Sequence, residues 1–159
     1  MTCTVASRVS DQSGSCRGAA WGNKMSDHLK EIPPAAQLLG REIVSVDPHS
    51  GEVKLQFTAK PEFANRHGTV QGGMLAAMLD SATGNAVMAR LPSHLTAVTS
   101  RLDTNFLKPA ALGVIVATAR LVRQDERSAE VTAELTDSEG KIVATAKAEL
   151  RIRERKSRS

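Results

Sequence analysis

Aromatic side chains are scarce in this chain: they make up 3% of the residues, and tyrosine is absent. The hydrophobic content is nevertheless 41%, so the core must be built mainly from Val, Leu, Ile and Ala. Proteins that bind single-stranded nucleic acids commonly stack the bases on aromatic side chains. The composition therefore predicts an aliphatic core and argues against nucleic acid as a partner.

Long hydrophobic runs are also missing. A membrane-spanning helix needs about 20 consecutive apolar residues, and the apolar runs of this sequence are far shorter. The N-terminal stretch also lacks the apolar segment of a secretory signal. We therefore expect a soluble protein with no membrane partner.

Cysteine occurs only at Cys3 and Cys16, and neither position has metal-ligand spacing. The absence of Cys from the rest of the chain fits a reducing compartment, so a cytoplasmic location is expected. The four histidines are scattered, with no ligand spacing. Neither a metal ion nor another cofactor is therefore expected.

The net charge of +4 is concentrated at the C-terminus. Five of the 21 basic residues and one of the 17 acidic residues lie in the last nine positions, so residues 1–150 are balanced. A DNA-binding domain would instead carry its basic residues on one folded face. The positive charge is interpreted as a solvated tail.

The length of 159 residues suits one domain with one substantial core. Residues 1–25 are rich in Ser, Gly and other small residues, and Met25 directly precedes the part with a core-like pattern. We expect 1–25 to be a flexible extension or to precede the true start. Residues 26–155 are expected to form the single domain, and 156–159 the basic tail.

Periodicity predicts one long helix among several strands. A short helix is expected over 26–39, starting afresh at Pro33-Pro34, and the long helix over 72–90, ending before Pro92. Strands are expected at 41–47, 52–59, 97–106, 113–124, 128–137 and 141–153, with an irregular loop at 61–70. The outer face of the last strand should carry Val143, Thr145, Lys147, Glu149 and Arg151. One long helix followed by four strands indicates an α+β fold.

The segment 65–80, NRHGTVQGGMLAAMLD, holds the candidate chemistry. A Gly-Gly pair at a helix start leaves backbone N–H groups bare, and these can bind a polarised carbonyl oxygen with help from the helix dipole. Asp80 follows two turns later on an otherwise apolar helix. An unpaired carboxylate there is costly to bury, which favours a catalytic role over a structural one.

Gly72 and Asp80 are eight residues apart, which is about 12 Å along a helix axis. A general base must come within roughly 3 Å of its proton, directly or through one water. If both residues act in one site, the carboxylate must therefore come from a second copy of the chain. The spacing indicates a dimer with shared sites.

The pattern Asn65-x-x-Gly68-x-x-Gln71-Gly72-Gly73, followed by Asp80-Ser81-Ala82, resembles the signature of the hotdog-fold acyl-CoA thioesterases. The similarity is strongest to the PaaI-like branch, the phenylacetate-pathway type. It continues through TAVTSRLDTNFLKPA at 96–110 and ELTDSEGKIVATAKAELRIR at 134–153, and covers about 120 residues. The resemblance implies a curved antiparallel sheet wrapped around one long helix, and an acyl-CoA substrate in a homodimer or a dimer of dimers.

The resemblance also implies roles for single residues. Asp80 would be the base or nucleophile, Gly72 the backbone donor to the thioester oxygen, and Asn65 and Thr99 would orient water or substrate. Gly73, Gln71, His67 and Arg151 are the candidate substrate contacts, Arg151 for the CoA phosphates. Gln71 stands where the family usually has histidine, and glutamine cannot titrate.

Two other functions are compatible with the same fold. The first is a non-catalytic acyl-CoA-binding hotdog protein, which the glutamine at position 71 favours. The second is a hotdog acyl-CoA hydratase, which needs a catalytic histidine beside its acid; His67 is the only histidine near the motif. The order Gly-Gly, then Asp, fits a thioesterase better.

Overall fold

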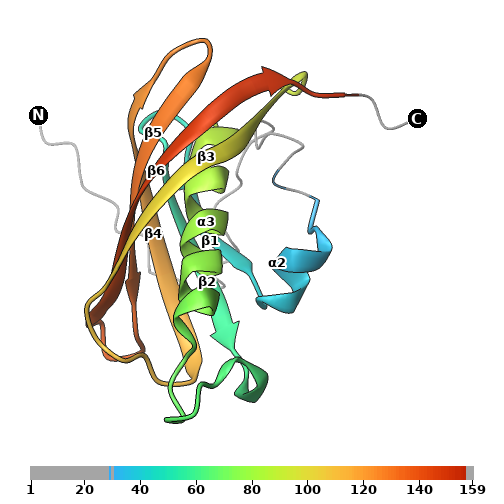
Figure 1. Ribbon diagram of the computed structural model, residues 1–159. Coiled ribbons are helices and arrows are strands. Elements are labelled where there is room, and N and C mark those ends of the chain that lie inside the picture. Colours follow the sequence, from blue (N-terminus) through green and yellow to red (C-terminus); the bar gives the residue numbers. More distant parts are fainter. Residues whose placement is uncertain (1–28, 30, 157–159) are drawn as a thin grey trace, which may run out of the picture.

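The structure is a computed structural model that describes Leu29 and residues 31–156 (Figure 1). The expected extension 1–25, residues 26–28 and 30 of the expected first helix, and the end of the tail lie outside the described residues. The elements run in the order α2 (Pro34–Leu38), β1 (Glu42–Asp47), β2 (Glu52–Ala59), η1 (Pro61–Phe63), α3 (Gly72–Met88), β3 (Leu95–Phe106), β4 (Gly113–Gln124), β5 (Ser128–Thr136) and β6 (Ile142–Glu154). The bounds of the long helix and of the six strands lie within a few residues of the expected ones. Of the first helix, expected over 26–39, residues 31–33 are not helical and α2 begins only at Pro34, because a proline disfavours the helical conformation in the residue before it.

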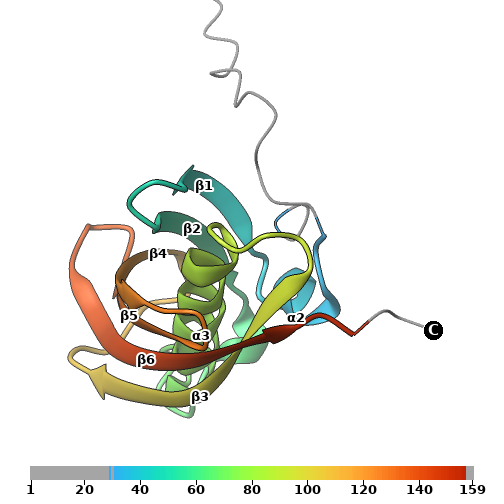
Figure 2. The same ribbon diagram turned by 90° about the horizontal axis from the view of Figure 1, so that it is seen from above.

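The six strands form one antiparallel sheet in the order β1-β2-β4-β5-β6-β3. Figures 1 and 2 show this sheet curving around α3, which lies in its concave side. The expected α+β class and hotdog arrangement are thereby confirmed. Among the described residues, no helix is long and apolar enough to cross a membrane.

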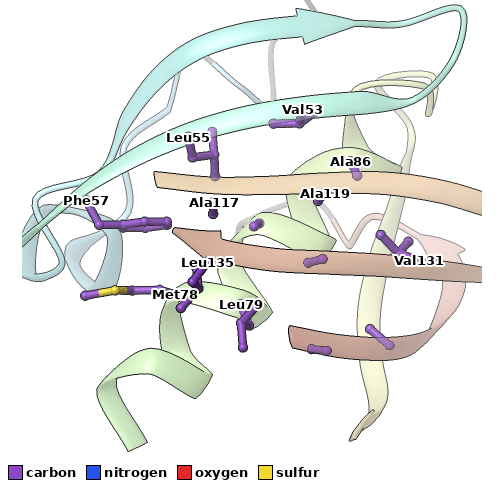
Figure 3. Packing of buried hydrophobic residues seen from close by; sticks show 14 of the residues in the cluster. Val53, Leu55, Phe57, Met78, Leu79, Ala86, Ala117, Ala119, Val131 and Leu135 are labelled. Carbon is purple, nitrogen blue, oxygen red and sulfur yellow. The ribbon is translucent and has the colours of Figure 1, made fainter. Parts of the chain in front are cut away.

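The core between α3 and the sheet is aliphatic, as the composition predicts. Met78 and Leu79 of α3 are fully buried, as are Phe57 of β2 and Leu135 of β5, and Figure 3 shows these side chains gathered between helix and strands. Alanines fill the closest approaches, with Ala82 and Ala86 on α3 and Ala117 and Ala119 on β4 all at 0% exposure. Small side chains on both surfaces allow the strands to pass close to the helix axis.

The outer face of β6 differs from the expectation at one position. Thr145 is half-buried, and Lys147, Glu149 and Arg151 are exposed as predicted, but Val143 is fully buried. Ala144 pairs with Leu135 and Ile142 with Thr136, which leaves Val143 as the extra residue of a β-bulge. A bulge re-aims the side chain of its extra residue, so strict alternation fails there.

One side of α3 is left open by the sheet. Nine residues of α3 are not fully buried. Five of them recur at helical spacing and form one stripe, Gly73, Ala77, Asp80, Gly84 and Met88, and the other four flank it, Gly72, Met74, Ala76 and Ser81. Asp80 is the exposed charge in the middle of this stripe. The open side of the helix therefore presents small residues, one carboxylate and, at its end, Met88.

The sheet ends in a long free edge. β3 pairs only with β6, and no other strand of the described chain lies on its far side. Ser100 is the extra residue of a bulge near the middle of β3, and Val98 beside it is half exposed. A 12-residue edge of this kind offers unpaired N–H and C=O groups to a second strand.

The turn between β1 and β2 contains a glycine that the packing requires. Gly51 has φ +72°, and a Cβ there would lie 2.7 Å from Leu121 Cβ and 3.1 Å from Arg90 Cδ. Gly140 in the β5–β6 turn has a similar φ of +77°, but no heavy atom lies within 4 Å of its added Cβ. The two positions therefore share the backbone strain of a substitution and differ in the steric clash.

We expect Gly51→Ala to lower the free energy of unfolding by roughly 1–3 kcal/mol more than Gly140→Ala, because only Gly51→Ala overpacks its surroundings. Both variants should carry the penalty of about 1–2 kcal/mol for a left-handed alanine. Urea unfolding of the two purified variants measures the difference. Equal losses would show that the contact with Leu121 relaxes without cost.

Candidate active site

The loop before α3 is held by two backbone hydrogen bonds at its end, one to the β3–β4 connection and one to η1. After η1, the Val70 N–H donates to the Ala110 carbonyl oxygen, and the Gln71 N–H donates to the Phe63 carbonyl oxygen, both at 2.8 Å. Phe63, Val70 and Ala110 are buried. These two bonds fix the point at which the helix begins.

Asn65 organises the loop between these anchors. Its Oδ1 accepts hydrogen bonds from the His67 N–H at 2.8 Å and the Thr69 N–H at 3.3 Å, and its Nδ2 donates to Thr69 Oγ1 at 2.9 Å. Gly68 takes a left-handed φ of +76°, which lets the chain turn back. The Asn65 N–H then donates to the Thr69 carbonyl oxygen at 2.8 Å and closes the loop.

The start of α3 is not capped. Gln71 is the N-cap residue, and its side chain makes no capping hydrogen bond. Within the described residues, the N–H groups of Gly72 and Gly73 have no hydrogen-bond acceptor. Bare N–H groups at the positive end of a 17-residue helix are suited to an oxygen that carries partial negative charge.

Gly72, at this helix start, lines a mostly apolar hollow. The hollow has a volume of about 400 Å³ and is lined by Asn65, His67, Thr69, Val70, Gly72, Leu75, Phe106, Leu107, Lys108, Pro109 and Ala110. The Phe106 ring stands over Gly72, since a Cβ at Gly72 would lie 3.3 Å from Phe106 Cζ. The structure thus brings together three residues predicted from the sequence, Asn65, His67 and Gly72.

Asp80 and Thr99 lie outside this hollow in the single chain. Asp80 belongs to the same continuous helix as Gly72, so the separation of about 12 Å along the axis holds in the structure. Its carboxylate is exposed. Thr99 is half-buried on β3 and is paired with Leu150 of β6. One chain alone therefore does not bring the carboxylate to the helix start.

Arg151 lines a different hollow, of about 390 Å³, on the outer face of the sheet. Arg123 and Arg127 lie on the same rim, together with Glu130 and Glu149. A hydrogen bond from the Lys147 ammonium keeps the pKa of Glu130 below its usual value, so Glu130 is ionised at neutral pH. The hollow carries three guanidinium groups against two carboxylates.

The residues 106–110 were not assigned a role from the sequence. The run TNFLKPA was part of the family resemblance, but no periodicity indicates that Phe106, Leu107 and Lys108 stand beside Gly72. Their position depends on the sheet, because the Leu107 and Lys108 N–H groups both donate to the Val143 carbonyl oxygen of β6. Thr69 was likewise missed, since nothing local singles out its hydroxyl.

Comparison with known proteins identifies the family. The profile of the thioesterase superfamily matches residues 67–144. A solved structure from Ralstonia eutropha JMP134, described as a candidate thioesterase and phenylacetic acid degradation-related protein, is 38% identical, with a TM-score of 0.77. The superposition covers 81% of this chain and 99% of that one. The chain belongs to the thioesterase superfamily.

Two further relatives agree with this placement. The structure of the Escherichia coli PaaI protein, from the phenylacetic acid degradation operon, is 26% identical with a TM-score of 0.71 and covers 79% of this chain and 88% of that one. The acyl-CoA thioester hydrolase YciA of Salmonella typhimurium is 33% identical over 87 residues, which are 54% of this thioesterase and 64% of YciA. The PaaI-like resemblance and the expectation of a thioester hydrolase are confirmed at the level of the family.

The bare helix start yields a test in which stability and activity should change in opposite directions. Gln71→Asp should cap α3 and raise the free energy of unfolding by about 0.5–2 kcal/mol. The same carboxylate competes for the N–H groups and repels a developing oxyanion, so thioesterase activity should fall at least about tenfold. Urea unfolding and steady-state kinetics measure the two effects.

Gln71→Asn is the matched control, because it caps the helix without adding charge. It should stabilise the fold to a similar degree and lower activity less than Gln71→Asp does. Wild-type activity in a stabilised Gln71→Asp variant would show that the substrate oxygen binds elsewhere.

Proposed function

We propose that this thioesterase hydrolyses acyl-CoA thioesters to the free acid and CoA. The observation that carries the proposal is the uncapped start of α3 at the apolar hollow, which Gly72 lines. The hollow offers an apolar surface for the acyl group, and the bare N–H groups offer hydrogen bonds to the thioester oxygen. The similarity to the acyl-CoA thioester hydrolase YciA supports CoA as the carrier.

In the proposed mechanism, the Gly72 N–H binds the thioester oxygen and stabilises the charge that develops on it, an effect commonly worth about 3–4 kcal/mol per donor. Asp80 takes a proton from a water that Thr99 holds, and the resulting hydroxide attacks the carbonyl carbon. The C–S bond then breaks, and the CoA thiolate leaves and is protonated. Direct attack by the Asp80 carboxylate is the alternative. Asn65 orients the substrate.

The carboxylate in this mechanism comes from a second copy of the chain. Three features of the structure support this: the distance between Gly72 and Asp80 on one helix, the exposure of Asp80, and the free edge of β3. Antiparallel pairing of β3 with β3 of a second copy would continue the sheet and bring the open sides of the two helices together. The small residues Ala77 and Gly84 on that side permit close approach.

The remaining expectations belong to the same proposal. Arg151 and its neighbouring guanidinium groups would bind phosphates of CoA, for which a hollow with more guanidinium than carboxylate groups is suited. Homodimers would assemble further into a dimer of dimers. A cytoplasmic location is the expectation from the absence of Cys after Cys16.

A panel of acyl-CoAs tests the function directly. With aryl and medium-chain acyl groups, wild-type protein should release free CoA, detected through the reaction of its thiol with a disulfide dye. Asp80→Asn should lower kcat by about a hundredfold or more and leave the fold and the oligomer intact, because the amide cannot act as a base. Tight binding of acyl-CoA without thiol release would instead support the non-catalytic alternative. Hydration of an unsaturated acyl-CoA, followed by ultraviolet absorbance, would support a hydratase.

Complementation between two inactive variants tests the shared site. Gly72→Pro removes the N–H at the first helical position, where proline is tolerated, and the extended Gln71 backbone (φ −60°, ψ 132°) suits a following proline. Neither Gly72→Pro nor Asp80→Asn should be active alone. After subunit exchange, mixed dimers contain one site with both intact residues, so activity should return to about a quarter of wild type.

Exchange has to be shown separately, for example by mass spectrometry of differently tagged subunits. A mixture that exchanges and stays as inactive as its parents would rule out sites built across the interface.

A further inference from the structure

We propose that Thr69 supplies the second hydrogen bond to the thioester oxygen, and that Asn65 is a positioning residue that acts through the Thr69 hydroxyl. This inference rests on the proposed function, because it concerns the same substrate oxygen as the Gly72 N–H. It changes the role of Asn65 from a substrate contact to the group that orients the contact.

The orientation of the Asn65 amide is fixed by its surroundings. The His67 and Thr69 N–H groups can only donate, so the side-chain atom that faces both must be Oδ1. The Nδ2 group then necessarily points at Thr69 Oγ1, 2.9 Å away. Both lone-pair directions of Oδ1 are occupied by the loop itself, and none is left for a water or a substrate.

The same bond fixes the polarity of the Thr69 hydroxyl. Thr69 Oγ1 accepts from Nδ2, so its own proton must point elsewhere. No acceptor for that proton occurs among the described residues. Thr69 lines the hollow together with Gly72, and it lies three residues before the start of α3. An oxygen bound in this hollow can therefore receive the hydroxyl proton in addition to the Gly72 N–H.

Substitutions at Thr69 test the donor. Thr69→Val keeps the shape and removes the hydroxyl, and should lower kcat/KM for acyl-CoA hydrolysis at least about tenfold, mainly through kcat. Thr69→Ser restores the hydroxyl and should recover to within about threefold of wild type. Thr132→Val is the control, because Thr132 is an exposed threonine on the outer face of β5 and should not affect turnover.

Asn65→Asp tests the positioning role. The carboxylate can still accept from the His67 and Thr69 N–H groups, so the loop should keep its shape. Its second oxygen cannot donate, and the Thr69 hydroxyl must turn and donate to it, which withdraws the proton from the hollow. Asn65→Asp should therefore lose at least as much kcat/KM as Thr69→Val, since its carboxylate also repels a developing oxyanion, at unchanged thermal stability.

A double-mutant cycle distinguishes action of Asn65 through the Thr69 hydroxyl, the relay, from direct contact between Asn65 and the substrate. One Nδ2 hydrogen of Asn65 is not used within the described chain, and could itself reach the substrate. If Asn65 acts through Thr69, the double variant Asn65→Asp with Thr69→Val should be no worse than Asn65→Asp alone, which already lacks the hydroxyl proton. Losses that multiply would show that Asn65 contacts the substrate and would overturn the relay. Near-wild-type activity of Thr69→Val would overturn it as well.

Binding of an inert ketone distinguishes this inference from the proposed function. The probe is an acyl-CoA analogue in which a methylene group replaces the thioester sulfur, so the carbonyl acceptor remains and hydrolysis is impossible. Calorimetry should give weaker binding for Thr69→Val and Asn65→Asp than for Thr69→Ser. If wild-type protein binds the ketone in this pattern but cleaves no thioester, the relay stands and the hydrolase proposal falls. If wild-type protein does not bind it, both fall.

Discussion

The close packing of alanines between α3 and the sheet is the constraint on which the rest of the structure depends. Ala82 and Ala86 on the helix and Ala117 and Ala119 on β4 are entirely excluded from solvent. With so few aromatic side chains, the layer between helix and sheet is thin, and the strands curve around the helix at close range. A larger residue at any of these positions would push the helix outward, and the bonds that hold its first turn would lengthen.

The position of the helix decides what its first turn can do. The backbone hydrogen bonds from Val70 to Ala110 and from Gln71 to Phe63 join the loop to the β3–β4 connection on one side and to η1 on the other. The chain therefore enters α3 at a fixed place, with Phe106 against Gly72. Because the Gln71 side chain makes no capping hydrogen bond, the partial positive charge of the helix start is not balanced by a side-chain oxygen. The helix start lacks the hydrogen bond of a capping side chain, and a ligand oxygen can supply that hydrogen bond instead.

The local sequence pattern was sufficient to predict most elements of the fold. The long helix, the six strands and their turns follow from apolar periodicity, Gly and Pro, and the bounds differ from the structure by only a few residues. The prediction that Val143 lies on the outer face was wrong, because a bulge depends on how two strands pair. The alternation of residues within one strand does not reveal that pairing. The free edge of β3 could not be predicted from the sequence either, since the order of strands is a property of the whole sheet.

The candidate site was only partly accessible from the sequence. The Gly-Gly helix start and Asp80 stand out because their residue types conflict with an ordinary apolar helix. Phe106 and Lys108 do not stand out, because they reach the hollow only through the pairing of β3 with β6. The chemistry of Asn65 needed coordinates, since its role follows from which of its atoms face the loop backbone.

The edge of β3 also has a consequence for the single chain. A newly folded single chain exposes a long row of unsatisfied backbone groups, which other polypeptides could extend into disordered aggregates. Arg101 and Asp103 on this strand are charged and exposed, and the bulge at Ser100 interrupts a flat ladder. These features disfavour promiscuous strand addition, while a matched twofold copy can accommodate the same irregularity on both sides. The irregular edge would therefore favour pairing with a second copy over pairing with unrelated chains during biosynthesis, in addition to any effect on affinity.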